Sequence, residues 1–340
     1  MRGFGSDNHS GVHPDILKSF AEANIGHAPS YGTDEWTAKA EKVFQNHFGV
    51  DTQVFFVFNG TAANVTALKA MMSSYQAVLC SDISHMNMDE CGAPEFFTGG
   101  KLIAVPSVDA KISVAILEQY FSRRGDQHAS QARVLSLTQP TELGTTYTTQ
   151  ELRELIAWAK SKELLVHIDG ARLANAAYHL KLGFKEFTTD LGIDVVSMGG
   201  TKNGLMMGEA VLFLNKSLAK DFKFIRKQAA QLPSKTRFIS AQFLAYFQDD
   251  LWRKIAAHSS AMAQLMYQHV KDIPGIEVRC APESNAVFAK IPKAWLKPLR
   301  QHFFFYVWDE KTFECRWMTS WDTQEQDILD FAKKLKELSR

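Results

Sequence analysis

The chain has 340 residues, of which 46% are hydrophobic and 22% are charged. Its 38 Lys and Arg residues almost balance 37 Asp and Glu residues, giving a net charge of +1, so the charge does not favour nucleic acid or an acidic membrane surface as a partner. Since a single core stops growing at roughly 250 to 300 residues, we expect one large domain and a smaller one.

Short β-branched and aromatic runs recur along the first two thirds of the chain, each followed by a polar loop and a longer amphipathic stretch. Seven of these runs are predicted to be strands: residues 54–58, 77–81, 102–105, 134–137, 164–168, 195–198 and 211–214. They are apolar on both faces and alternate with helices such as the one expected at 149–162. This pattern predicts an α/β fold with a mostly parallel seven-stranded sheet and helices on both faces. The last run follows its predecessor too closely for a helical crossover, so we expect it to run antiparallel.

From about residue 217 the pattern becomes helical, and this part ends at Pro274 and Gly275. Further strands are expected at 276–280, 286–291, 303–308 and 315–319, followed by a closing helix at 324–339. We therefore predict a large domain of residues 1–250, which includes the N-terminal segment, and a small α+β domain of residues 251–340.

The N-terminus, MRGFGSDNHSGVHPD, is too polar for a signal peptide, and no apolar run approaches the roughly 18 residues of a membrane span. The four cysteines, Cys80, Cys91, Cys280 and Cys315, form no C-x-x-C pair and have no histidine at metal-ligand spacing. We expect reduced structural thiols, no metal site, and a cytoplasmic protein without a membrane partner.

The segment NGTAAN, residues 59–64, follows the first predicted strand and precedes a helix-like stretch. A turn through Gly60 and Thr61 at a helix N-terminus offers free backbone N–H groups and the positive end of the helix dipole, which suit a phosphate. The same letters also fit a common turn in which the threonine caps the helix.

The segment HIDGAR, residues 167–172, places Asp169 at the end of a predicted buried strand, where open α/β sheets have their ligand crevice. A buried carboxylate needs a cation, a metal or a protonated heterocycle, since an unpaired buried charge costs several kcal/mol. Alternatively, Asp169 caps the helix that begins near Ala171 or forms an ion pair with Arg172.

The segment GGTKNG places Lys202 33 positions after Asp169, again at the end of a predicted strand. Gly199, Gly200 and Gly204 allow a tight turn and leave room for a bulky partner. A desolvated lysine has a lowered pKa and attacks aldehydes, whereas an exposed loop lysine needs no such surroundings. The turn, the aspartate and the lysine together match the phosphate, the ring nitrogen and the aldehyde of pyridoxal phosphate.

With these motifs, the sequence resembles the fold-type-I pyridoxal-phosphate enzymes and, within them, the low-specificity threonine aldolase (β-eliminating lyase) family. The resemblance extends nearly end to end, through SDNHSG, SYGTD, NGTAAN, SHMNMDECGAPEFF, HIDGARLANA, GGTKNG, ESNAVFAKIP and RWMTSWDT. It implies a fold-type-I transferase-like fold, pyridoxal phosphate as cofactor, and a homodimer or homotetramer with shared active sites.

The resemblance also implies the cofactor contacts. Lys202 would bind the cofactor's aldehyde, Asp169 would hold its ring nitrogen, and Arg172 would be a neighbouring contact. His85 would stack on the ring, although an isolated histidine is more often a satisfied core residue. The turn through Gly60 and Thr61 would bind the phosphate.

The substrate contacts implied by the resemblance include Ser6 and Arg316 for the carboxylate, a task that suits a guanidinium. Taken alone, Arg316 would be read as a surface ion pair. Tyr31 in SYGTD is a further expected substrate contact. Many family members place a histidine for the substrate hydroxyl in the loop where this chain reads TQPTELG, so Thr141 and Glu142 are expected near that hydroxyl.

Lys227 differs from the family pattern, as the loop TQPTELG does. It stands where family members have an arginine that reaches the phosphate bound by a neighbouring subunit. A lysine supplies the charge for this contact but lacks the planar fork.

The implied reaction is that of an aldehyde-lyase: retro-aldol cleavage of L-threonine, L-allo-threonine or a related β-hydroxy-α-amino acid such as phenylserine to glycine and an aldehyde. His85, Glu90 or a water held by them would accept the hydroxyl proton. Alternatives are an aminotransferase or β-eliminating lyase, which would use the same lysine, aspartate and arginine, and a non-catalytic binding protein of the same fold. The sequence leaves open the preferred amino acid and aldehyde, the threo or erythro preference, the base, the oligomer size and the pathway.

Overall fold

The computed structural model describes residues 3–340. Its larger part is built on a seven-stranded sheet with the strand order β1-β7-β6-β5-β4-β2-β3. Only β7 runs against its neighbours, β1 and β6, so the predicted mostly parallel sheet with an antiparallel last strand is confirmed. The strands are β1 (Gln53–Val57), β2 (Gln76–Ser81), β3 (Lys101–Val105), β4 (Gln131–Thr138), β5 (Leu165–Gly170), β6 (Val195–Met198) and β7 (Glu209–Phe213).

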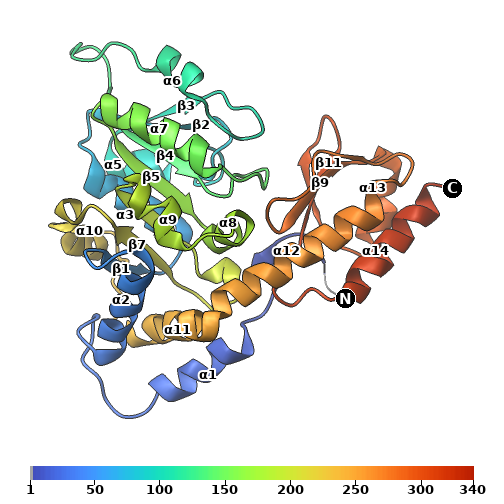
Figure 1. The fold of residues 1–340 in the computed structure, drawn as a ribbon, viewed down its shortest axis with the longest axis horizontal. Coiled ribbons are helices and arrows are strands. Elements are labelled where there is room, and N and C mark those ends of the chain that lie inside the picture. Colours follow the sequence, from blue (N-terminus) through green and yellow to red (C-terminus); the bar gives the residue numbers. More distant parts are fainter. Residues whose placement is uncertain (1–2) are drawn as a thin grey trace.

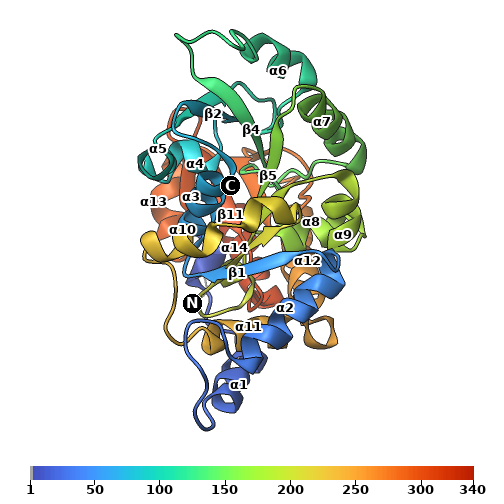
Figure 2. The same cartoon turned by 90° about the vertical axis from the view of Figure 1, so that its left-hand side faces the viewer.

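Both faces of this sheet are buried, because neighbouring residues of a strand enter different hydrophobic cores. On β5, Leu165 packs in the core beneath α3, and Val166 packs in the core on the opposite face. Figure 2 shows α3 and α5 on one side of the strands and α7, α8 and α9 on the other. The expected helices on both faces are therefore confirmed.

The helices follow the strands in the alternation expected of a parallel sheet. Those of the larger part are α1 (Pro14–Ala23), α2 (Glu35–Phe48), α3 (Gly60–Met71), α4 (His85–Met88), α5 (Ala93–Thr98), α6 (Val114–Tyr120), α7 (Thr149–Ser161), α8 (Leu173–Leu180), α9 (Phe184–Phe187), α10 (Phe222–Gln228) and α11 (Arg237–Phe247). Short 3-10 turns are η1 (Asp7–His9), η2 (Thr189–Leu191), η3 (Thr201–Asn203), η4 (Lys216–Ala219) and η5 (Gln248–Asp250). The predicted helix at 149–162 is α7, which begins with a capping box of Thr148 and Glu151.

The smaller part is an antiparallel sheet with the order β10-β11-β9-β8, covered by helices. Its elements are α12 (Leu251–Val270), β8 (Glu277–Val278), β9 (Ala286–Lys290), α13 (Lys293–Arg300), β10 (Tyr306–Asp309), β11 (Glu314–Met318) and α14 (Glu325–Leu338). The expected strand at 303–308 begins only at Tyr306, because Phe303 and Phe305 are side chains of the core that precede the strand. The expected strand at 276–280 is reduced to two residues.

The helix α12 joins the two parts (Figure 1). Its first turns contribute Trp252 and Ile255 to a core of the larger part, and its later turns contribute Met266 and Val270 to the core of the smaller part. The N-terminal segment also reaches the smaller part, since Phe4 donates its backbone N–H to Phe304 at 2.7 Å. A division near residue 250 remains our proposal.

All four cysteines are free, with Cys80 and Cys315 buried and Cys91 and Cys280 exposed. Among the helices between residues 3 and 340, none combines the length and the apolar character that a membrane crossing needs.

Candidate active site

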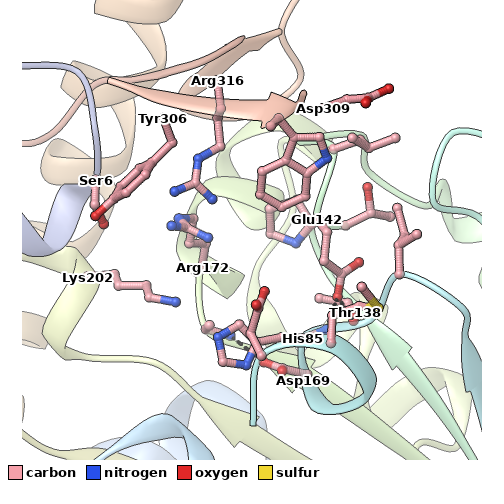
Figure 3. A pocket seen from close by; sticks show the side chains of 18 of the residues that line it. Ser6, His85, Thr138, Glu142, Asp169, Arg172, Lys202, Tyr306, Asp309 and Arg316 are labelled. Atoms are coloured by element: carbon pink, nitrogen blue, oxygen red, sulfur yellow. Dashed lines mark hydrogen bonds between the residues drawn. The ribbon is translucent and has the colours of Figure 1, made fainter. Parts of the chain in front are cut away.

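The carboxyl ends of β4, β5 and β6 lie side by side, and the ends of β4 and β5 together with the turn after β6 form one wall of a cavity of about 940 Å³. Asp169 on β5 pairs in register with Thr138 on β4 and with Ser197 on β6. Because parallel strands end at the same edge, motifs that are far apart in the sequence meet there. Figure 3 shows Asp169, His85, Lys202, Arg172 and Arg316 around this single space.

Asp169 is a buried carboxylate that has no ion-pair partner among residues 3–340. Its Oδ2 accepts a hydrogen bond from Asn64 Nδ2 at 2.8 Å, and its Oδ1 accepts one from the Ala171 backbone N–H at 3.1 Å. The alternative expectation of an ion pair with Arg172 is wrong, because the guanidinium of Arg172 binds a different carboxylate. Asp169 is therefore free to meet a cationic group of a ligand.

Arg172 forms a two-pronged ion pair with Asp7 of the N-terminal segment. The Nε–Oδ2 distance is 2.6 Å and the Nη2–Oδ1 distance is 2.9 Å. Asn285 also donates to Asp7, at 3.1 Å. This geometry neutralises Arg172 and places it in the cavity wall with its charge already balanced.

Lys202 lies on η3, in the turn that follows β6. Burial and the nearby charge of Arg172 lower the pKa of its amine. No carboxylate in the described part of the chain pairs with its Nζ, which points into the cavity in Figure 3. The predicted desolvated lysine is thus present, with the properties of an amine nucleophile.

The glycines of this turn make room for the protein itself, which corrects the expectation that they leave space for a bulky ligand. A Cβ on Gly199 would lie 2.0 Å from the Ala171 carbonyl oxygen, and a Cβ on Gly200 would lie 2.6 Å from the Gly208 carbonyl oxygen. Gly204 has a φ of +90°. The turn therefore packs against neighbouring backbone on both sides.

Glu209 supports the same turn and was missed from the sequence. Its buried carboxylate accepts the Gly200 backbone N–H and a hydrogen bond from Thr201, and burial raises its pKa to about 7. The sequence signal was a lone acidic residue at the start of an apolar strand, seven positions after Lys202.

His85 begins α4 and faces the cavity, with a side chain 41% exposed. Its Nδ1 lies 2.9 Å from Glu90 Oε1, and the same oxygen accepts a hydrogen bond from Asn64 at 2.9 Å. The hydrogen bond to Glu90 is the largest influence on the pKa of His85 and raises it. Glu90 itself is fully buried, so it acts on the cavity through His85.

The loop TQPTELG lines the side of the cavity next to His85. Glu142 Oε1 accepts the backbone N–H of His85 at 3.0 Å and the hydroxyl of Thr138 at 2.8 Å, and burial raises the pKa of Glu142 to about 7. The hydroxyl of Thr141 lies 2.7 Å from that of Thr145 and is thereby engaged within the loop. Both expected residues line the cavity.

Arg316 and Ser6 enter the cavity from the smaller part and the N-terminal segment. The Nη2 of Arg316 donates to the Gly5 carbonyl oxygen at 3.2 Å, and its Nε is buried without a partner. No acidic side chain between residues 3 and 340 pairs with it, so the alternative of a surface ion pair is wrong. Burial, followed by the charge of Arg172, lowers the pKa of Arg316 to about 10.

The NGTAAN turn forms the start of α3 and opens onto an adjoining cavity of about 290 Å³. Asn59 caps this helix, since its Oδ1 accepts the Ala62 backbone N–H at 2.9 Å. The alternative in which Thr61 is the cap is therefore wrong. Gly60 and Thr61 line the smaller cavity together with Lys202, so a helix N-terminus faces the lysine.

Tyr31 and Lys227 lie away from both cavities. Lys227 Nζ is 5.3 Å from the centre of the Tyr31 ring, and neither side chain lines the space around Lys202. Within one chain, these two expected site residues therefore lie apart from the rest of the site.

Three comparisons with known proteins agree with one another. A family model described as Beta-eliminating lyase matches residues 3–293. Low specificity L-threonine aldolases from Pseudomonas sp. (strain NCIMB 10558) and Pseudomonas aeruginosa are 42% and 41% identical to this chain, and each alignment covers 98% of this chain and 96% of the relative. A solved structure of a threonine aldolase from Leishmania major has a TM-score of 0.94 and 30% identity, with full coverage of both chains.

Proposed function

The chain belongs to the β-eliminating lyase family, and from that premise we propose that it is a pyridoxal-phosphate-dependent aldolase. It cleaves the Cα–Cβ bond of L-threonine, L-allo-threonine and related β-hydroxy-α-amino acids such as phenylserine, and it releases glycine and an aldehyde. The shared name of the two Pseudomonas relatives and their coverage of 96% of each relative's length support this activity.

One observation carries the proposal: three ionisable groups without ion-pair partners in the described chain converge on one cavity. They are the amine of Lys202, the carboxylate of Asp169 and the guanidinium of Arg316. Withdrawing a charged group from water without a partner is costly, so the presence of all three in one cavity indicates a ligand that satisfies them. An aldehyde, a protonated ring nitrogen and a carboxylate are the matching groups.

The residues of the two cavities fit pyridoxal phosphate. Asp169, itself fixed by Asn64, would hold the ring nitrogen, and the free N–H groups at the start of α3 would hold the phosphate. When bound, the cofactor supplies an aldehyde for the substrate amine and a conjugated ring that accepts the electron pair of the broken Cα–Cβ bond.

Arg316 and Ser6 bind the substrate carboxylate and thereby fix the direction of the Cα–Cβ bond. His85 accepts the proton of the β-hydroxyl, because its ring faces the cavity and Glu90 occupies its Nδ1. Glu90 is buried and bound to both His85 and Asn64, which makes it a support for the imidazole. Glu142 holds the backbone of His85 in place.

The proposal is tested by incubating the purified protein and pyridoxal phosphate with L-threonine, L-allo-threonine and phenylserine, and by measuring the aldehyde and glycine released. We expect equal amounts of both products. Release of a keto acid would instead indicate an aminotransferase or a β-eliminating lyase, and no aldehyde from any of the three substrates would reject the aldolase.

The assignment of Lys202 has a separate spectroscopic test. The wild-type protein should show an absorbance band from the cofactor bound to the lysine, and Lys202→Ala should lose it. A band that survives this substitution would contradict the assignment.

We also propose that active sites are shared between subunits of a homodimer or homotetramer in the cytoplasm. Tyr31 and Lys227 support the sharing, since both lie outside the cavities of their own chain, where a neighbouring subunit could meet them. The four free cysteines fit a reducing compartment.

A further inference from the structure

Arg316 lies in β11, an inner strand of the small sheet, with an aromatic residue on each neighbouring strand. Its register partners are Tyr306 on β10 and Phe288 on β9. Between Val307 and Asp309 the register of β10 shifts by one residue, so Trp308 is the additional residue of a β-bulge. Bulges change the direction of a side chain, and this bulge brings the indole of Trp308 against the guanidinium.

The guanidinium of Arg316 lies over two aromatic rings. Its Cζ is 5.1 Å from the centre of the Trp308 ring and 5.7 Å from that of Tyr306. Both distances lie within the roughly 6 Å over which a cation is attracted to a ring face. Figure 3 shows Arg316 beside Tyr306, with its guanidinium directed toward the centre of the cavity.

Trp308 is itself fixed by packing. Its ring meets the edge of Phe288 at 5.6 Å with an interplanar angle of 87°, in a cluster that includes Leu143 and Met318. The indole is therefore held on one side by packing, which fixes where a cation lies against its ring.

Arg172 and Arg316 show two ways of stabilising a guanidinium in one cavity. Arg172 gives two of its N–H groups to Asp7, whose carboxylate balances the charge of the guanidinium. Arg316 is stabilised by ring faces, which attract the cation but take up none of its N–H donors. A built-in carboxylate at Arg316 would compete with the carboxylate of the substrate, whereas aromatic rings do not.

We propose that Trp308, with a smaller contribution from Tyr306, is a positioning residue that holds Arg316 by its ring face and keeps its N–H donors free for the substrate carboxylate. The inference rests on the proposed function, since it takes the ligand of Arg316 to be that carboxylate. It assigns no direct contact between Trp308 and the reacting atoms.

The expected signature is a uniform loss of affinity for amino acids. Every substrate and the product glycine carry the same carboxylate, so a weakened Arg316 should raise their dissociation constants by about the same factor. If Trp308 instead contacts the group on Cβ, its replacement should affect phenylserine strongly and glycine little.

The test compares Trp308→Phe with Trp308→Leu in the holoenzyme. Phenylalanine keeps a ring face, and leucine fills much of the same space without one, so the pair separates the ring face from packing. Glycine affinity is measured by titration of the cofactor absorbance, and KM and kcat are measured with threonine and phenylserine. We expect Trp308→Leu to lower the affinity for glycine about fivefold to tenfold and Trp308→Phe to lower it less than about twofold.

A double-mutant cycle with Arg316→Gln then tests whether Trp308 acts through Arg316. We expect Trp308→Leu to change glycine affinity less than about twofold in the Arg316→Gln background, since no cation remains to be held. An equal loss in both backgrounds, or an effect confined to phenylserine, would overturn the proposal. If Arg316→Gln alone left the glycine affinity unchanged, the premise that Arg316 binds the carboxylate would be overturned. If the wild-type protein bound glycine but released no aldehyde from any substrate, only the aldolase activity would be rejected.

Discussion

The hydrogen bond between His85 Nδ1 and Glu90 Oε1 governs the pH range in which the imidazole is neutral. It raises the pKa of His85, and burial of the ring opposes it. A base must be neutral, so kcat/KM should rise with pH through this raised pKa. Glu90→Gln removes the charge that favours the imidazolium, so the rising limb of the profile should move to lower pH.

The measurement is the pH dependence of kcat/KM for threonine in the wild type and in Glu90→Gln. Glu154→Gln, an exposed position on α7, is the matched control and should leave the profile in place. A limb that stays fixed or moves to higher pH in Glu90→Gln would show that His85 is not the base.

Glu142 gives a prediction about stability, because burial raises its pKa from the ordinary value of 4.5 to about 7 in the folded protein. At low pH this carboxyl is protonated in both the folded and the unfolded chain, and it does not affect stability. As the pH rises from about 4.5 through 7, the unfolded chain loses the proton more readily than the folded chain, so the free energy of unfolding falls. Glu142→Gln keeps an oxygen for the His85 N–H. It should raise stability at pH 8 by about 1–3 kcal/mol and change it little at pH 5.

Thermal unfolding of the wild type and Glu142→Gln at these two pH values checks the difference in melting temperature. A variant that is less stable at pH 8, or that gains equally at both values, would contradict the proposed effect of burial on this carboxyl.

At the residue scale, the sequence predicted the reactive groups better than their partners. Lys202 and Asp169 could be located because an apolar run marks the strand of each: Asp169 lies near the end of β5, and Lys202 follows the end of β6 by four positions. The pairing of Arg172 with Asp7 could not, since the two residues are 165 positions apart and only the folded N-terminal segment brings them together. Asp169, three positions before Arg172, was the nearer candidate for its ion-pair partner in the sequence, and that prediction was wrong.

At the scale of elements, the turn after β6 is positioned by its contact with the turn after β5. Gly199 lies against the backbone of Ala171, where a Cβ would come within 2.0 Å of the carbonyl oxygen. Gly199→Ala should therefore separate the two turns, lower the free energy of unfolding by about 1–3 kcal/mol and weaken cofactor binding at Lys202. Gly11→Ala is the control, because no atom lies within 4 Å of its Cβ position.

Melting temperature and the rate of cofactor release during dialysis measure the two effects of Gly199→Ala. If the variant matched Gly11→Ala in both, the close contact would not determine the position of the lysine.

The elements of the large sheet were predictable because alternation with helices and burial on both faces leave a clear sequence pattern. The small sheet was harder, since its strands are short and its flanking segments are equally apolar. Phe303 and Phe305 illustrate the difficulty: they show the alternation of a strand, yet they fill the core ahead of β10. The bulge at Trp308 has no signal in the sequence, because it depends on the register with β11.

At the scale of the whole molecule, the cavity is built from both parts of the chain. Asp169 comes from the large sheet and Lys202 from the turn after β6, whereas Arg316 and Tyr306 come from the small sheet. The cofactor and the substrate carboxylate would therefore be held by different parts, which α12 connects through its share in both cores. Motion of one part relative to the other would change the distance between Lys202 and Arg316.

The position of Lys227 leads to a prediction about the assembly. If Lys227 serves the site of a neighbouring subunit, a mixed dimer of Lys202→Ala and Lys227→Ala chains contains one complete site. That site combines Lys202 from one chain with Lys227 from the other. Random 1:1 mixing makes half of the dimers mixed, and each of these has one of two sites intact, so activity should recover to about a quarter of the wild-type value.

Co-expression of the two variants with different affinity tags, followed by purification of the mixed species, measures this recovery directly. Each variant alone should be nearly inactive, and the isolated mixed dimer should reach about half of the wild-type activity, since one site of its two is complete. If Lys227 acted within its own chain, neither site of the mixed dimer would be complete and no activity would return. Recovery would therefore establish both the dimer and the reach of Lys227 into its partner, because a monomer with the same two substitutions on separate chains has no means of combining them.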